Sequence, residues 1–177
     1  MHDIAQLAKD IKLLILDVDG VCTDGRLYFN DQGECMKAFH VHDGLGIKLL
    51  QQRGIVVAII TSRQSKALEQ RLAGLEVEHV YQGYENKILA YEKLLETLKL
   101  TDEQVAYVGD DLPDLPVMQR VKCAIAVKNA HAIVKENAHW TTTITGGEGA
   151  VREVCDLLIQ ANTNYDDLFE AHLGSPS

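Results

Sequence analysis

The 177-residue sequence predicts one α/β domain, spanning residues 1–177, built on a doubly wound parallel sheet. Two observations carry this prediction. Short apolar runs suited to buried parallel strands recur along the chain, and helical patterns separate them. The length suits one domain with a substantial core, and the hydrophobic fraction of 46% and charged fraction of 24% are ordinary for a soluble globular protein.

The strands and helices are expected to alternate along nearly the whole chain. The predicted strands are 13–16, 56–60, 79–81, 105–108 and 124–127, of which 79–81 has the weakest pattern. The predicted helices are 45–52, 65–72, 86–98, 115–120, 130–136 and 150–161. Because each helix connects or follows a strand, we expect helices on both faces of the sheet.

Segment 25–39 interrupts this alternation and is predicted to form a β-hairpin. Two strand-like stretches, 26–29 and 36–39, flank residues 30–34, whose Gly33 suits a turn. The hairpin is expected to project beside the loop that follows the first strand. No other insertion is long enough to form a separate cap domain.

Charge and cysteine usage exclude several classes of protein. The net charge of −9 argues against nucleic acid as a partner, which would demand clustered Lys and Arg. The four cysteines are scattered with no C-x-x-C pair, which favours free thiols in a reducing compartment. No signal peptide is evident, and no apolar run approaches the length that crosses a membrane. These features predict a cytoplasmic protein with no membrane partner.

Two carboxylates follow the first predicted strand directly. Successive strand side chains point to opposite faces, so Asp17 and Asp19 are expected on the same side. Like charges this close are unfavourable unless a cation neutralises them or one takes up a proton. A turn is the plain alternative for an Asp-x-Asp-Gly sequence. The functional interpretation is a Mg²⁺ site for phosphoryl chemistry.

Other polar residues stand at strand ends or helix starts, where ligands of open α/β sheets bind. Thr61 suits a phosphate cradle, although a helix cap is the plain alternative. Lys87 opens a helix, where the dipole disfavours a cation; it would neutralise a phosphoryl oxygen or simply face water. Asp110, Asp111 and Asp114 follow the fourth strand. Asp110 is the expected second carboxylate for a cation, and Asp111 a candidate helix cap.

The order of these residues resembles the haloacid dehalogenase superfamily of phosphohydrolases over nearly the whole chain. The finer pattern is similar to its small, capless sugar-acid phosphatases. The matching blocks are 17–25, 37–39, 43–48, 58–63, 81–83, 86–87, 106–112 and 146–153.

This resemblance implies a mechanism for the strand-end residues. Asp17 would be the nucleophile that forms an aspartyl-phosphate, and Asp19 the general acid and then the general base. Mg²⁺ would be held by Asp17, a backbone oxygen of Asp19 and Asp110. Thr61 and Lys87 would bind the phosphoryl oxygens.

The resemblance also implies contacts to a small phosphorylated sugar acid and a homotetramer in which the hairpins assemble and neighbouring chains complete each pocket. Asp111 and Asp114 would orient the metal ligands or Lys87. The implied sugar-acid contacts are Asp19, His40, Val41, His42, Asp43, Gly44, Lys48, Arg63, Arg71 and Lys87.

The resemblance implies that the substrate is 3-deoxy-D-manno-octulosonate 8-phosphate, used in lipopolysaccharide precursor synthesis. A nine-carbon sialic-acid-type 9-phosphate is the closest alternative, and Arg63 favours the eight-carbon sugar. Ser62, His42 and Glu148 depart from the resembled pattern near the substrate. A receiver-like signalling domain and a non-catalytic assembly module are the alternatives from other classes. The order of the acidic residues does not fit the former, and the complete set of strand-end residues argues against the latter.

Overall fold

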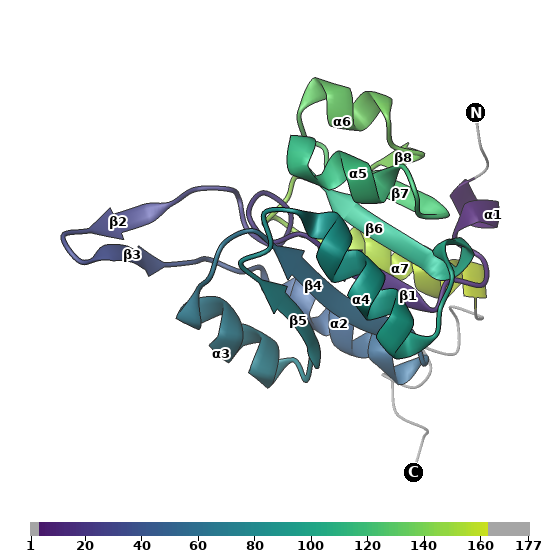
Figure 1. Ribbon diagram of the computed structural model, residues 1–177, viewed down its shortest axis with the longest axis horizontal. Coiled ribbons are helices and arrows are strands. Elements are labelled where there is room, and N and C mark those ends of the chain that lie inside the picture. The colour runs from purple at the N-terminus through teal and green to yellow at the C-terminus, as the bar shows by residue number, and fades with distance from the viewer. Residues whose placement is uncertain (1–3, 163–177) are drawn as a thin grey trace, which may run out of the picture.

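A computed structural model describes residues 4–162 and has a six-stranded sheet at its centre (Figure 1). Its order is β5-β4-β1-β6-β7-β8, and every neighbouring pair is parallel. The strands are β1 (Leu13–Leu16), β4 (Val56–Thr61), β5 (His79–Gln82), β6 (Val105–Gly109), β7 (Cys123–Ala126) and β8 (Trp140–Thr141). The predicted fold class is confirmed.

Helices cover both faces of the sheet. On one face α2 packs against α7, and on the other α4 packs against α5 (Figure 1). The helices are α1 (Ile4–Leu7), α2 (Val41–Gln52), α3 (Lys66–Gly74), α4 (Lys87–Leu98), α5 (Leu115–Met118), α6 (Ala132–Glu136) and α7 (Ala150–Asn162), with short 3-10 turns η1 (Asp102–Gln104) and η2 (Leu112–Asp114). None of these helices has the length and apolar character needed to cross a bilayer.

The central strand β1 determines where the site lies. All four of its residues are buried, and it pairs with β4 on one side and β6 on the other. The chain leaves β1 toward β4 and returns later on the β6 side, which makes the carboxyl end of β1 a topological switch point. Crevices at such points are where open α/β sheets bind ligands. The Asp17 amide donates to the Val108 carbonyl at 3.1 Å, so the first carboxylate is held against β6.

The predicted hairpin is present and extends away from the body of the molecule (Figure 1). It comprises β2 (Tyr28–Asn30) and β3 (Gly33–Met36), paired antiparallel with an irregularity at Tyr28 and Phe29. Its strands lie closer to the tip than the sequence predicted. The Asn30 side chain accepts from the Gln32 amide at 2.9 Å, which confines the turn to two residues. Within residues 4–162 no separate cap domain covers the sheet.

Helix α2 begins at Val41, four residues before the predicted start. Gly44 and Gly46 weaken the helical pattern in this region, since glycine is a poor helix former. Close packing explains Gly46, because a Cβ there would lie 2.9 Å from the Arg152 side chain. Residues 41–44, which precede the predicted helix 45–52, therefore form its first turn. The short elements α1 and β8 were not predicted.

Candidate active site

A pocket of about 260 Å³ lies at the carboxyl ends of the central strands. It is lined by Asp17, Asp19, Thr61, Ser62, Arg63, Lys87, Asp110, Asp111, Pro113 and Asp114. The residues come from loops after three strands and from the starts of two helical segments. The structure therefore brings together every residue that the sequence predicted for phosphoryl transfer.

The first carboxylate is almost completely buried beside a lysine. Asp17 Oδ1 accepts from Lys87 Nζ at 2.6 Å. Burial raises the pKa of Asp17, the Lys87 ammonium lowers it and the Asp114 carboxylate raises it, with a net value of about 6. The contact with Lys87 holds this carboxylate in a fixed direction, an arrangement that suits a nucleophile.

Lys87 is the first residue of α4, and Asn86 caps that helix through a bond from the Ile88 amide at 3.2 Å. The lysine points into the site, where its Nζ lies 2.6 Å from both Asp17 Oδ1 and Asp114 Oδ1. Burial alone would lower the pKa of Lys87, but these two carboxylates raise it above its ordinary value. The unfavourable helix position is thus offset by two buried ion pairs.

Asp114 is buried and accepts hydrogen bonds on both carboxylate oxygens. Its Oδ1 accepts from Lys87 and from the Tyr107 hydroxyl, each at 2.6 Å. Its Oδ2 accepts from the amides of Asp110 and Asp111 at 2.9 and 3.2 Å. Burial raises the pKa of Tyr107 well above its ordinary value, so the hydroxyl stays protonated and donates. Asp114 therefore holds the Lys87 ammonium, the Tyr107 hydroxyl and the backbone amides of Asp110 and Asp111 together.

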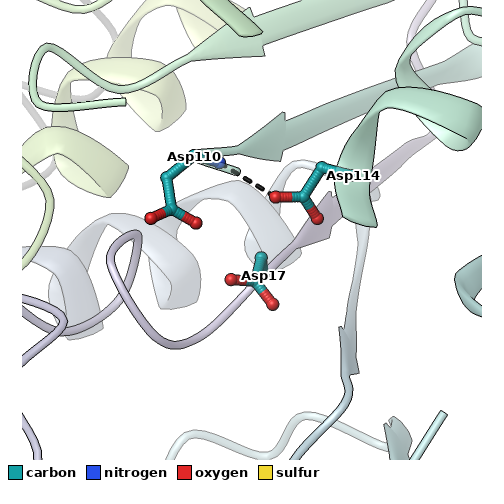
Figure 2. A group of neighbouring side chains, drawn as sticks. All are labelled: Asp17, Asp110 and Asp114. Carbon is teal, nitrogen blue, oxygen red and sulfur yellow. Dashed lines mark hydrogen bonds between the residues drawn. The ribbon is translucent and has the colours of Figure 1, made fainter. Parts of the chain in front are cut away.

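Three carboxylates meet at this point in an arrangement that suits a divalent cation (Figure 2). One oxygen from each of Asp17, Asp110 and Asp114 lies within 4.8 Å of the others. Burial, followed by the charges of Asp17 and Asp114, raises the pKa of Asp110 to about 8. Because the four donors already occupy Asp114, the carboxylates of Asp17 and Asp110 are the better candidates for metal ligands.

Gly20 explains how the loop after β1 approaches Asp110. Its φ is +99°, and a Cβ there would lie 2.0 Å from Asp110 Oδ2. Any side chain at this position would push the Asp110 carboxylate away from the loop that carries Asp17 and Asp19. The glycine of the Asp-x-Asp-Gly sequence is therefore part of the acidic site rather than only of a turn.

Asp19 is partly exposed and lies between two basic side chains. Its Oδ1 contacts the ammonium of Lys37, and its Oδ2 lies 3.7 Å from Arg63 Nε. Lys37 follows β3 on the return leg of the hairpin. The hairpin therefore contributes a side chain to the site, which links its position to that of Asp19.

Of the two candidate helix caps in this region, Asp111 has that role, whereas Ser65 rather than Thr61 caps α3. Thr61 ends β4 and is buried, with its Oγ1 3.4 Å from the Arg63 amide. Asp111 caps η2, accepting from the Leu112 amide at 2.8 Å. The Thr61 hydroxyl therefore lies at the start of the loop that leads to Arg63, on the wall of the pocket.

The residues predicted to contact the sugar acid lie in three separate cavities and on the surface of α2. Arg63 lines the pocket together with Asp19 and Lys87. His40, Asp43, Gly44 and Arg71 surround a separate cavity of about 20 Å³. His42 lines a third cavity, Lys48 is half-buried on α2, and Val41 is exposed at the start of that helix. The catalytic pocket of one chain thus collects only part of the predicted contact set.

Internal contacts occupy several members of that set. Asp43 is buried, its Oδ1 accepts from the Arg152 amide at 2.8 Å, and burial raises its pKa. The Arg71 guanidinium donates to the His40 carbonyl at 3.3 Å. A Cβ on Gly44 would lie 2.3 Å from that guanidinium. These residues fix the start of α2 against α3 and α7.

The largest of the described cavities, about 390 Å³, lies beside α7. His42, Trp140, Glu148 and Arg152 are among the residues that line it. It contains none of the residues predicted for phosphoryl transfer. His42 and Glu148, which depart from the resembled pattern, therefore share a surface that is separate from the acidic pocket.

Sequence reasoning missed two residues that contact the site. Lys37 stands within a matching block, but its spacing gave no sign that it reaches Asp19. Tyr107 lies in the middle of β6, where an apolar run predicts only core packing. Residues two apart in a strand share a face, so Tyr107 lies on the same face as Gly109, next to Asp114. That spacing was the available signal for its role.

Comparison with known proteins identifies the family. A family model described as haloacid dehalogenase-like hydrolase matches residues 78–154. The 3-deoxy-D-manno-octulosonate 8-phosphate phosphatase KdsC of Yersinia pestis is 53% identical over 164 residues, which cover 93% of this chain and 88% of that protein. KdsC of Escherichia coli K12 is 50% identical over 165 residues, with the same coverage. This chain belongs to the KdsC phosphatase family.

A solved structure of a KdsC-family relative shows the same fold with ligands bound. The 3-deoxy-D-manno-octulosonate 8-phosphate phosphatase of Moraxella catarrhalis, in complex with magnesium ion, phosphate ion and KDO, superposes with a TM-score of 0.93. It is 41% identical, and the match covers 98% of this chain and 99% of that one. The predicted membership of the haloacid dehalogenase superfamily is confirmed.

Proposed function

We propose that this protein is a Mg²⁺-dependent phosphatase that hydrolyses 3-deoxy-D-manno-octulosonate 8-phosphate to the free sugar acid and phosphate, in lipopolysaccharide precursor synthesis. The observation that carries the proposal is the convergence of Asp17, Asp19, Thr61, Lys87 and Asp110 in one pocket. The identity of about half of all residues to KdsC enzymes supports the same substrate.

The first half-reaction transfers the phosphoryl group to the protein. A carboxylate oxygen of Asp17 forms a bond to phosphorus while the bond from phosphorus to the sugar oxygen breaks. Asp19, in its acid form, gives its proton to that sugar oxygen as it leaves. Lys87 lies beside Asp17 and Thr61 lines the same pocket, so both are suited to bind phosphoryl oxygens.

The second half-reaction restores the enzyme. Asp19, now a carboxylate, takes a proton from a water molecule whose oxygen bonds to phosphorus. The bond between phosphorus and Asp17 breaks, which releases phosphate and regenerates both carboxyl groups in their starting forms. The structure holds Lys87 and Asp114 in place by buried contacts to each other and to the Tyr107 hydroxyl, so the charges that stabilise the transition state need little rearrangement.

The carboxylates of Asp17 and Asp110 and the backbone oxygen of Asp19 would hold Mg²⁺. Burial, followed by the charges of Asp17 and Asp114, raises the pKa of Asp110 to about 8. A nearby cation would offset the part that comes from these carboxylates, which supports the assignment. When bound, the ion neutralises charge between carboxylates and phosphate. Asp111 and Asp114 would keep these ligands in place.

We further propose a cytoplasmic homotetramer of single-domain chains. The division of the predicted sugar contacts among separate places supports a pocket that neighbouring copies complete. Exposed apolar side chains on the hairpin, including Leu27, Phe29 and Met36, support it as the assembly surface. The predictions of no nucleic-acid and no membrane partner stand as part of this proposal.

Turnover of a panel of phosphorylated sugar acids tests the function. With Mg²⁺, we expect the eight-carbon 8-phosphate to give the highest kcat/KM, above the nine-carbon 9-phosphate. A chelator should abolish phosphate release, and Asp17→Asn should do the same. Phosphate release that survives either treatment would reject the mechanism, while a preference for the nine-carbon substrate would reject only the sugar assignment.

A further inference from the structure

Lys37 is a buried lysine that belongs to the hairpin yet contacts the catalytic pocket. Only 2% of its side chain is exposed, and its ammonium meets Asp19 Oδ1. Removing an ammonium from water costs several kcal/mol, so a buried lysine requires charge or hydrogen-bond partners. The ion pair with Asp19 therefore compensates the buried charge of Lys37, so the side chain contributes its charge as well as its packing.

The two cations beside Asp19 differ in how firmly they can hold it. Arg63 Nε is 3.7 Å from Oδ2, and 42% of the Arg63 side chain is exposed. Exposed ion pairs of this length contribute little, because solvent screens them and the side chains stay mobile. The buried Lys37 contact is charge-assisted and shielded from water, which makes it the stronger constraint on the carboxylate.

Lys37 therefore fixes the orientation of the Asp19 carboxylate through its Oδ1 atom. With Oδ1 held by Lys37, Oδ2 lies on the side of Arg63, which lines the pocket. Proton transfer needs the acid within hydrogen-bond reach of the leaving oxygen, so rotation of Asp19 would slow both half-reactions. Lys37 lies one residue beyond β3, and the hairpin's return strand therefore determines where the ammonium stands.

We propose that Lys37 is a positioning residue that fixes Asp19 for proton transfer. This inference rests on the proposed function and deepens it. Lys37 holds Oδ1, so that the Oδ2–H bond of the acid form breaks as its proton passes to the departing sugar oxygen. Oδ2 later takes a proton from the attacking water. Lys37 itself exchanges no proton with substrate.

The test separates the two half-reactions by the choice of leaving group. Nitrophenolate leaves without a proton, so p-nitrophenyl phosphate can phosphorylate Asp17 even when Asp19 is misplaced. In Mg²⁺-loaded Lys37→Met we expect a rapid burst of about one nitrophenolate per site, followed by slow hydrolysis that requires Asp19 as base. On the sugar-acid phosphate, kcat should fall about 10- to 100-fold with KM within about threefold of wild type.

Three further variants serve as an alternative neutral change, a charge-conserving change and a control. Lys37→Gln, a smaller polar change, should show the same burst and carries the test if Lys37→Met does not fold. Lys37→Arg keeps the charge and should recover most of the lost kcat. Arg26→Met removes a cation from the other leg of the hairpin, where 78% of the side chain is exposed, and should keep kcat within about twofold of wild type.

The proposal is overturned if both neutral Lys37 variants turn over the sugar phosphate at the wild-type rate. It is also overturned if they lose activity on both substrates equally without a burst, because that pattern indicates general disruption of the site. Either result requires an active wild-type enzyme. Failure of the wild type itself on every sugar-acid phosphate would instead reject the proposed function.

Discussion

The catalytic pocket and the hairpin depart from ordinary burial rules in opposite directions. The pocket buries charged groups, with Asp17, Lys87 and Asp114 all nearly inaccessible to solvent. The hairpin exposes apolar ones, and Phe29 is 62% exposed. Buried charge is expected only where partners compensate it, and clustered exposed apolar side chains usually mark an interaction surface. Each departure supports the role proposed for its region: chemistry in the pocket and assembly at the hairpin.

The two regions also differ in what completes them. Within the described part of the chain, Lys87 and four hydrogen bonds to Asp114 satisfy the buried groups of the pocket. The hairpin consists of two strands that extend from the body (Figure 1), and isolated two-stranded hairpins have marginal stability in water. The acidic part of the pocket is thus organised by one chain, whereas in the proposed assembly a second copy would cover the hairpin.

Replacing Lys87 should have the largest effect, because it removes the positive charge that balances two buried carboxylates in the pocket. Lys87→Met leaves the Asp17 and Asp114 carboxylates without their shared cation. We expect kcat to fall at least about 100-fold and the free energy of unfolding to fall by about 3–5 kcal/mol. Steady-state kinetics and urea unfolding measure both, with exposed Lys66→Met as the control. Unchanged kcat would contradict the role of Lys87.

A charge on the hairpin should separate the copies of the proposed tetramer while leaving the acidic residues of each chain in place. Phe29→Asp is expected to convert the tetramer to smaller species, since truncating a central interface aromatic costs about 2 kcal/mol or more. The kcat/KM for the sugar-acid phosphate should fall about tenfold, because each pocket loses its neighbour. Light scattering and kinetics measure this, with Gln32→Asp at the exposed tip as the control. A variant that stays tetrameric would remove the hairpin from the interface.

Deleting the Tyr107 hydroxyl tests whether one hydrogen bond to Asp114 affects stability and catalysis. Tyr107→Phe removes one of the four donors to Asp114. We expect the free energy of unfolding to fall by about 1–3 kcal/mol, and kcat to fall about three- to tenfold as Asp114 and Lys87 loosen. Tyr81→Phe, the same deletion on β5, should change neither quantity appreciably. Equal effects in the two variants would show that Tyr107 contributes only packing.

Metal binding should stabilise the fold more at high pH than at low pH. Without metal, the folded-state pKa values of Asp17 and Asp110, about 6 and about 8, exceed the ordinary carboxyl value of 3.8. The folded state then binds more protons than the unfolded state, so stability falls as pH rises from about 4 to about 8. Mg²⁺ compensates the repulsion between the ionised Asp17 and Asp110 carboxylates, which is largest at high pH. The rise in Tm on adding Mg²⁺ should therefore be several degrees larger at pH 8 than at pH 5. A pH-independent increment would place the ion elsewhere.

The sequence predicted the pocket better than its surroundings, for a physical reason. Buried strands have continuous apolar patterns, and parallel strands align their carboxyl ends, so Asp17, Thr61 and Asp110 could be placed together without coordinates. The start of α2 was missed because Gly44 and Gly46 hide the helical pattern. Their small size reflects close approach by Arg71 and Arg152, which no local pattern reveals.

Contacts that depend on side-chain direction across the fold were also beyond sequence reasoning. Lys37 reaches Asp19 only because the hairpin returns beside the loop after β1. The sugar contacts of segment 40–44 came from resemblance, and this chain holds Asp43 through the Arg152 amide, outside the acidic pocket. Whether such residues reach a substrate depends on contacts between distant parts of the fold, for which a single sequence carries no local pattern.

Mapping the phosphorylated residue shows whether Asp17 is the nucleophile. Asp19→Asn, mixed with p-nitrophenyl phosphate and Mg²⁺ and quenched in acid, should retain a phosphoryl group on the peptide that contains Asp17, detected by mass spectrometry. A chelator should prevent its formation. A phosphoryl group on any other side chain, or none while nitrophenolate is still released over many turnovers, would contradict the account.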